Sequence, residues 1–96
     1  MVAEGPRVQV VLPYSLREYA KGRELVEVQA GTLADAVARL SSEFPGLAYR
    51  ILDDHGRSRR YVLAFVNDEP VTDQAPDAVR LRDGDTVHIR PSVAGS

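Results

Sequence analysis

The side chains of this sequence that could do chemistry are two histidines, two pairs of carboxylates and a cluster of arginines. There is no cysteine, which excludes a thiolate nucleophile, a disulfide and a cysteine zinc site. His55 and His88 form no His-x-x-x-His pattern, and a metal site would need further ligands. We therefore expect both histidines to be exposed and no metal site to be present.

The carboxylates and arginines also have ordinary structural interpretations. Asp83-Gly84-Asp85 is typical of a tight turn, because Asp and Gly suit the backbone of a turn. Asp53-Asp54 and the run Arg57–Arg60 fall in a charged segment around Gly56. Such an arginine run could contact phosphate or an acidic partner, but it more often forms a solvated loop. None of these residues predicts a catalytic site by itself.

Composition sets the class of protein. The chain has 96 residues, 44% of them apolar, and a net charge of −2 from 12 basic and 14 acidic side chains. That is the size of one domain, residues 1–96, and the charge gives no reason to expect nucleic-acid binding. No apolar run approaches the ~20 residues that span a bilayer, and residues 1–6 do not resemble a signal peptide. We expect a cytoplasmic protein with no membrane or nucleic-acid partner.

The first half of the sequence predicts a hairpin and a helix. Apolar and polar residues alternate over 7–12 and over 24–29, which predicts two antiparallel strands joined by a polar connection with a turn at Gly22. From Thr32, a favourable N-cap, the apolar period becomes helical and continues to Phe44. Pro45-Gly46 should end this helix. Its apolar side chains are expected in the core: Leu33, Val37, Leu40 and Phe44.

The second half predicts three more strands. Residues 47–52 suggest one short turn, and 53–60 a charged loop. The run 61–66, Tyr-Val-Leu-Ala-Phe-Val, is continuous and β-branched or aromatic, which favours a central strand. A short return strand over 69–71 and a last strand over 86–90 follow. The fold class is therefore α+β, a mixed sheet of four to five strands with one main helix packed on one face.

The register of the strand over 61–66 decides which side chains face away from the helix. One register turns Tyr61, Leu63 and Phe65 outward, and the other turns Val62, Ala64 and Val66 outward. With Leu63 and Phe65 outside, these two residues would join His88 and Arg90 of the last strand in an exposed apolar patch. A patch of that kind is typical of a docking face.

Three stretches of the sequence together resemble the ThiS/MoaD sulfur-carrier family, which has the β-grasp or ubiquitin-like fold. The first is 31–47, a helix followed by Phe-Pro-Gly-Leu. The second is 65–71, which contains Val-Asn-Asp-Glu. The third is 81–95, Leu-Arg-Asp-Gly-Asp-Thr-Val-His-Ile-Arg-Pro-Ser-Val-Ala-Gly, similar to the ending of the family. The resemblance covers nearly the whole chain from Arg7 and is closest to the CysO-like branch.

The resemblance implies a carrier rather than an enzyme. In the family, an adenylating enzyme of the ubiquitin-activating type, similar to MoeB and ThiF, uses ATP to activate the C-terminal carboxylate. A sulfur donor then forms a thiocarboxylate. A sulfur-accepting enzyme consumes it, such as a pyridoxal-phosphate-dependent cysteine synthase or a thiosugar or thiazole synthase. The product could be cysteine, molybdopterin, thiamin or a specialised thio-metabolite. The carrier itself would bind no cofactor.

The tail that would carry this chemistry follows Pro91, which cannot donate to a strand ladder. We expect this tail to be flexible and to enter the partner; it consists of Ser92, Val93, Ala94, Gly95 and Ser96. Five extended residues reach at most about 17 Å. A terminal carboxylate has a reference pKa of about 3.5, so it is an anion at neutral pH and can attack a phosphorus centre.

The ending departs from the family pattern, because Gly95-Ser96 stands where the family has Gly-Gly. Three interpretations stay open. Ser96 is an altered terminus on a working carrier, a peptidase such as a metalloprotease removes it, or the carrier activity has been lost. In the last case the protein is a β-grasp binding module with an inactive tail. Serine adds a Cβ and a hydroxyl that a channel built for glycine would resist.

Overall fold

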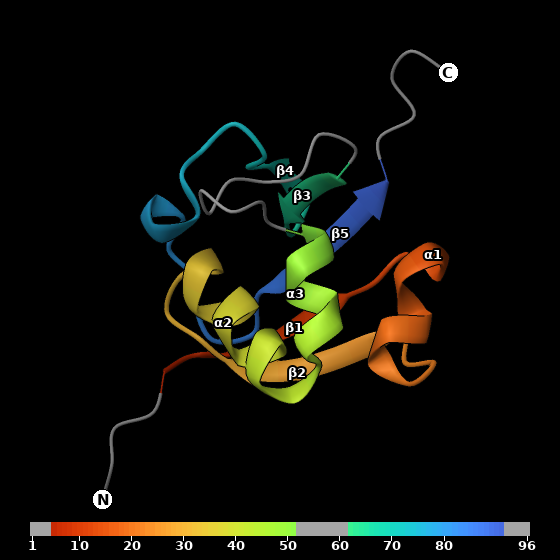
Figure 1. The fold of residues 1–96 in the computed structure, drawn as a ribbon. Coiled ribbons are helices and arrows are strands. Elements are labelled where there is room, and N and C mark those ends of the chain that lie inside the picture. Colours follow the sequence, from red (N-terminus) through yellow and green to blue (C-terminus); the bar gives the residue numbers. More distant parts are fainter. Residues whose placement is uncertain (1–4, 52–61, 92–96) are drawn as a thin grey trace, which may run out of the picture.

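The chain folds as a mixed five-stranded sheet with two helices lying across one face (Figure 1). The structure is a computed structural model, which describes residues 5–51 and 62–91. The strands are β1 (Arg7–Val11), β2 (Leu25–Gln29), β3 (Val62–Val66), β4 (Glu69–Pro70) and β5 (Thr86–Pro91). The helical elements are α1 (Tyr14–Arg17), η1 (Glu18–Ala20), α2 (Leu33–Glu43), α3 (Pro45–Ile51) and η2 (Pro76–Ala78). The strand order is β2-β1-β5-β3-β4, which confirms the expected α+β class.

The expected hairpin of β1 and β2 is present, and β1 also pairs in parallel with β5. The inward side chains of these strands form the floor of the core. Val8 and Val87 are completely buried, and Val10 and Ile89 are at most 2% exposed. Because successive side chains of a strand alternate between the two faces, the residues between them point to the other side of the sheet.

Helix α2 begins where the sequence predicts, since the Thr32 hydroxyl accepts a hydrogen bond from the Asp35 amide at 3.1 Å. This N-cap satisfies one of the amides that a helix start leaves unpaired. Four expected core residues of this segment are buried: Leu33, Val37, Leu40 and Phe44. The apolar stripe therefore lies on the sheet, as its helical spacing indicates.

Helix α2 ends at Glu43 with Phe44 as its C-cap, directly before Pro45-Gly46, as expected. The expectation of one short turn after it was wrong, because a second helix, α3, begins at Pro45 and continues to Ile51. Proline is favourable at the first position of a helix, where its missing N–H has no partner in any case. Leu47 is completely buried and Ile51 is 2% exposed, and their spacing of four residues puts both on one face of α3. The second helix α3 therefore joins the expected main helix α2 over the same face of the sheet.

The connection between β1 and β2 is also more structured than its polar sequence suggests. It forms α1 and η1, and both elements bury one apolar side chain, Leu16 or Ala20, at the end of the core. The turn back to β2 places Lys21 and Gly22 at φ 56° and 82°. The expected turn at Gly22 is confirmed, since a positive φ suits glycine.

The continuous apolar run of β3 predicted a central strand, but β3 is not the middle strand of the sheet. That position belongs to β5, while β3 lies between β5 and the short edge strand β4. Ala64 is the only fully buried residue of β3, and its neighbours Leu63 and Phe65 are half-buried. Pro91 still belongs to β5 and lies opposite Val62, so pairing continues one residue beyond the expected end.

A turn network aligns the start of β5 with its neighbours. Asn67, at φ 57°, donates from its side chain to Asp85 Oδ1 and accepts from the Thr86 amide, both at 3.1 Å. The other oxygen of Asp85 accepts from the Arg82 amide at 2.8 Å. Asp83 Oδ1 accepts from the Arg7 amide at 2.9 Å, which ties the same turn to β1. The Asp83–Asp85 carboxylates therefore have structural partners, as expected of a turn.

Replacing Leu40 by alanine should lower the free energy of unfolding by about 2–5 kcal/mol, because Leu40 is 1% exposed and its loss leaves a cavity. Chemical denaturation measures the change. Leu25→Ala is the matched control, since Leu25 is 43% exposed and should cost about 1 kcal/mol or less. Equal losses for the two variants would contradict the placement of α2 on the sheet.

Replacing Asn67 by alanine should destabilise the fold by about 1–3 kcal/mol, since it removes two side-chain hydrogen bonds and leaves a Cβ at positive φ. Asn67→Gly should lose less, because glycine tolerates that backbone. Asp68→Ala, in the same turn, should stay within about 0.5 kcal/mol of the unchanged chain. If Asn67→Ala unfolds at the same denaturant concentration as Asp68→Ala, the network does not stabilise the turn.

Candidate functional site

The candidate site begins where the described residues end. Ser92, Val93, Ala94, Gly95 and Ser96 lie outside the described residues, so their expected flexibility and their chemistry stay predictions. Pro91 is described, and it continues β5 beside Val62 of β3. The described part of the chain therefore ends at one end of β5, the central strand of the sheet (Figure 1).

The structure settles the register that the sequence left open. Ala64 of β3 is 2% exposed and faces the core, so Leu63 and Phe65 point to the opposite face of the sheet. Leu63 lies opposite Arg90, and Phe65 lies opposite His88. The four residues expected to form a docking face are thus neighbours on the outer face of the sheet. His88 is half-buried there, more covered than the sequence suggested.

The outer face also carries an apolar row that the sequence reasoning missed. The pairing of the strands puts the members of this row side by side: Leu25 of β2, Val11 of β1, His88 of β5, Phe65 of β3 and Pro70 of β4. The signal was present in β1, because an alternation that buries Val10 must turn Val11 outward. The row extends the expected docking face across the whole sheet.

Arginine and phenylalanine meet at the tail end of this face. The guanidinium carbon of Arg90 lies 5.0 Å from the centre of the Phe65 ring, within the range of a cation–π contact. Such a contact at an exposed site contributes about 0.5–1 kcal/mol. It holds a positive charge on the apolar face, one residue before Pro91.

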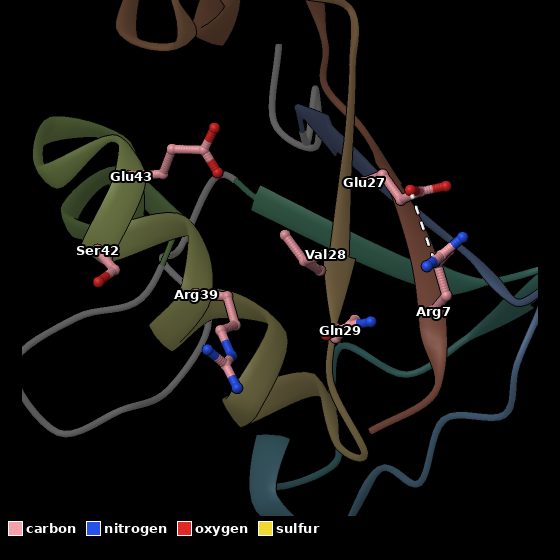
Figure 2. A pocket seen from close by; sticks show the side chains of 7 residues that line it. All are labelled: Arg7, Glu27, Val28, Gln29, Arg39, Ser42 and Glu43. Carbon is pink, nitrogen blue, oxygen red and sulfur yellow. Dashed lines mark ion pairs between the residues drawn. The ribbon is translucent and has the colours of Figure 1, made fainter. Parts of the chain in front are cut away.

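A polar groove lies between β2 and α2 (Figure 2), with a volume of about 530 Å³. Arg7 and Glu27 form an ion pair of 3.7 Å on its sheet side, and Arg39 and Glu43 stand on α2 across Val28. Gln29 and Ser42 complete the lining. Charges of both signs are spread along the two walls of this groove. Its lining does not resemble a catalytic site.

The structure brings no metal site together among the residues that it describes. Over 5–51 and 62–91, no three His, Asp or Glu side chains are grouped as metal ligands. Asp53-Asp54, His55 and the run Arg57–Arg60 lie outside these ranges, so the interpretations of these residues stay predictions. Within the same ranges, no helix is both long and apolar enough to cross a membrane.

A family model and a relative of known function both match most of this chain. The model of the ThiS family matches residues 10–95 of this chain. The sulfur carrier protein CysO of Mycobacterium tuberculosis is 34% identical over 90 residues, which cover 92% of this chain and 97% of the relative.

Two solved structures support the match. The crystal structure of CysO from M. tuberculosis has a TM-score of 0.82 at 33% identity, covering 90% of this chain and 99% of the other. CysO in the crystal structure of the BexX/CysO complex from Amycolatopsis orientalis has the same TM-score at 30% identity, covering 93% and 99%. The fold is therefore the β-grasp fold of these proteins.

The family match spans nearly all of the sequence, including the segment before and after Pro91. Because the sequence and the fold agree, the chain belongs to the ThiS family, and the sulfur carrier proteins named CysO are among its relatives.

Proposed function

We propose that this protein carries sulfur as a thiocarboxylate at its C-terminus and delivers it to a biosynthetic enzyme. The match to the ThiS family over residues 10–95 carries the proposal, because it includes the residues beyond the last strand. In this role the protein is a co-substrate rather than a catalyst. It binds no cofactor of its own, and the ATP is bound by the activating partner.

The thiocarboxylate forms in two steps in the active site of the partner. The terminal carboxylate attacks the α-phosphorus of ATP, which forms an acyl adenylate and releases pyrophosphate. A hydrosulfide equivalent from a sulfur donor then attacks the carbonyl carbon, and AMP leaves with the electron pair of the broken C–O bond. The product is a thiocarboxylate, which the sulfur-accepting enzyme consumes. The protein contributes reach and recognition, and the partner contributes the catalytic groups.

The outer face of the sheet supplies recognition in this proposal. Leu63, Phe65, His88 and Arg90 lie beside the root of the tail, so a partner that holds them receives the tail at a defined place. Half-buried apolar side chains with an arginine at their rim are typical of interface hot spots. The partners that fit are an adenylating enzyme of the MoeB/ThiF type and a sulfur-accepting enzyme. CysO of A. orientalis, for comparison, crystallised with BexX.

One observation favours a second function. Gly95-Ser96 replaces the Gly-Gly of the family, and a carboxylate on serine has a Cβ beside it. If nothing removes Ser96, the protein can act as a binding module that uses the outer face without sulfur chemistry. If a metalloprotease removes it, the carboxylate of Gly95 becomes available.

Three chains with defined ends test the chemistry: one ending at Ser96, one ending at Gly95, and Ser96→Gly. Each is incubated with ATP, the adenylating enzyme of the same organism and a sulfur source, and its intact mass is measured. Ser96→Gly should convert best, because glycine allows the closest approach. The chain ending at Gly95 should be slower, since it is one residue, about 3.4 Å, shorter. The chain ending at Ser96 should be poor.

Equal conversion of all three chains would show that the terminal residue does not matter. Conversion of none of them, while the same enzyme converts a known carrier, would favour the binding module. Partner binding in the absence of ATP serves as the control. It should change little among the three chains, because most of the contact area would be on the globular body.

Phe65→Ala should weaken binding to the adenylating enzyme by about tenfold, as expected for loss of an aromatic side chain at an interface. Calorimetric titration measures the dissociation constant, and an unfolding curve checks that the variant folds. Gln9→Ala is the control on the same face, one row away from Phe65. Similar dissociation constants for Phe65→Ala and the unchanged chain would remove Phe65 from the docking face.

A further inference from the structure

A second exposed surface, rich in arginine and tyrosine, is not used by the proposed function. We call it the basic end. It is formed by α1, η1, the turn after η1 and α3, and its members are Tyr14, Arg17, Tyr19, Lys21, Arg23 and Arg50. Tyr14 is 83% exposed, an unusual fraction for a large aromatic side chain.

The basic end lies at the edge of the sheet from which the tail leaves. Strands β1 and β5 run in parallel, and Val11 of β1 lies opposite His88 of β5. Three residues further along each strand come Tyr14, the first residue of α1, and Pro91, the last residue of β5. Because parallel strands end at the same edge, α1 and the root of the tail are neighbours, as Figure 1 shows at the head of the β5 arrow.

Several of these side chains are held in place before any partner arrives. The guanidinium of Arg50 lies 4.0 Å from the centre of the Tyr19 ring. The backbone of Gly46 also lies close to this ring, since a Cβ added at Gly46 would be 3.7 Å from it. Arg17 donates to the Leu12 carbonyl at 3.3 Å and lies 5.7 Å from the Tyr14 ring. Ordered side chains lose less conformational entropy on binding, so the surface is suited to recognition.

The charge of the basic end is opposite to that of the chain. Its elements and the turn carry four basic side chains and two acidic ones, Glu18 and Glu24, whereas the whole chain has a net charge of −2. Glu24 is paired with Arg17 at 3.4 Å. Lys21, Arg23 and Arg50 are exposed, so the surface favours an acidic partner.

Two observations favour a protein over a nucleic acid as that partner. The exposed Tyr14 and the half-buried Tyr19, both beside arginines, have the composition of protein–protein hot spots. The rest of the molecule is net acidic and would repel a phosphate backbone beyond the immediate contact. A partner that receives the tail must also come within reach of this edge of the sheet.

We propose that the basic end binds an acidic surface of the adenylating enzyme and steers the tail toward its active site. This proposal rests on the proposed function, since it needs an enzyme that accepts the tail. Opposite charges across an interface mainly raise the association rate and set the orientation. The basic end therefore raises the association rate with the enzyme, and the apolar outer face lengthens the lifetime of the complex.

Charge reversal at the basic end tests the proposal through the kinetics of thiocarboxylate formation. In the Ser96→Gly background, Arg23→Glu combined with Arg50→Glu should raise KM about tenfold or more and leave kcat within about twofold, as expected for lost steering. The matched control is Arg39→Glu combined with Arg82→Glu. It changes the net charge equally, on α2 and on the loop before β5, and should change KM by about twofold or less.

The effect of salt gives a second readout. The KM of the Ser96→Gly chain should rise between 50 mM and 500 mM salt, since screening weakens exposed charge pairs, and the basic-end variant should have lost most of this dependence. Arg23→Lys combined with Arg50→Lys keeps both positive charges, so its KM should stay close to that of the Ser96→Gly chain. This variant separates the effect of the charge from the effect of side-chain packing. Unfolding curves verify that each variant is folded.

Three results would overturn the inference. If both charge-reversed chains have the same KM, only the net charge matters. If the KM of the Ser96→Gly chain does not respond to salt, there is no electrostatic steering. If the basic-end variant keeps its KM but loses affinity for duplex DNA of random sequence, the surface serves nucleic acid. If the Ser96→Gly chain is never converted, it is the proposed function that fails.

Discussion

The parallel pairing of β1 with β5 fixes which side chains of these strands face the helices and which face away. It joins the first and last strands in the middle of the sheet and buries Val8, Val10 and Val87 beneath the helices. The turn before β5 sets the register, since Asp83 accepts from the Arg7 amide and the Gln9 amide donates to the Asp85 carbonyl. A slip of one residue would exchange the two faces of the sheet. The apolar row and the exit of the tail both follow from this register.

The motifs that mark the family divide into structural and functional parts. Asn67 and Asp85, from two separate motifs, bond to each other and hold adjoining strand ends in register. Their side chains are therefore accounted for by folding, and no chemistry needs to be assigned to them. In the proposed function, the reactive group of the last motif belongs to the segment that follows Pro91, and the residues that recognise the partner belong to β3 and β5.

Much of this fold could be predicted from the sequence, because its signals are local. The alternation in β1, β2 and β5, the Thr32 cap and the spacing of Leu33, Val37 and Leu40 each have one simple interpretation. The elements that were missed needed tertiary knowledge. Helix α2 ends before Pro45, as predicted, but the second helix that begins there is stabilised by the burial of Leu47 and Ile51 in the core, which no local signal reveals. The apolar run of β3 fitted either register, and its pairing with β5 turned Phe65 outward. The position of the basic end depends on which two strands pair in parallel, and the predicted mixed sheet did not specify that these are β1 and β5.

The carrier function is tested by the mass of the C-terminal peptide from the protein isolated from its own cells. Thiols and thiocarboxylates would be alkylated at lysis, and the last residue of the chain would be identified by mass spectrometry. Part of the protein should carry one sulfur in place of one oxygen at its terminal carboxylate, and this part should disappear when the adenylating enzyme is deleted. A terminal carboxylate that never carries sulfur, even in cells that lack the sulfur-accepting enzyme, would contradict the carrier function.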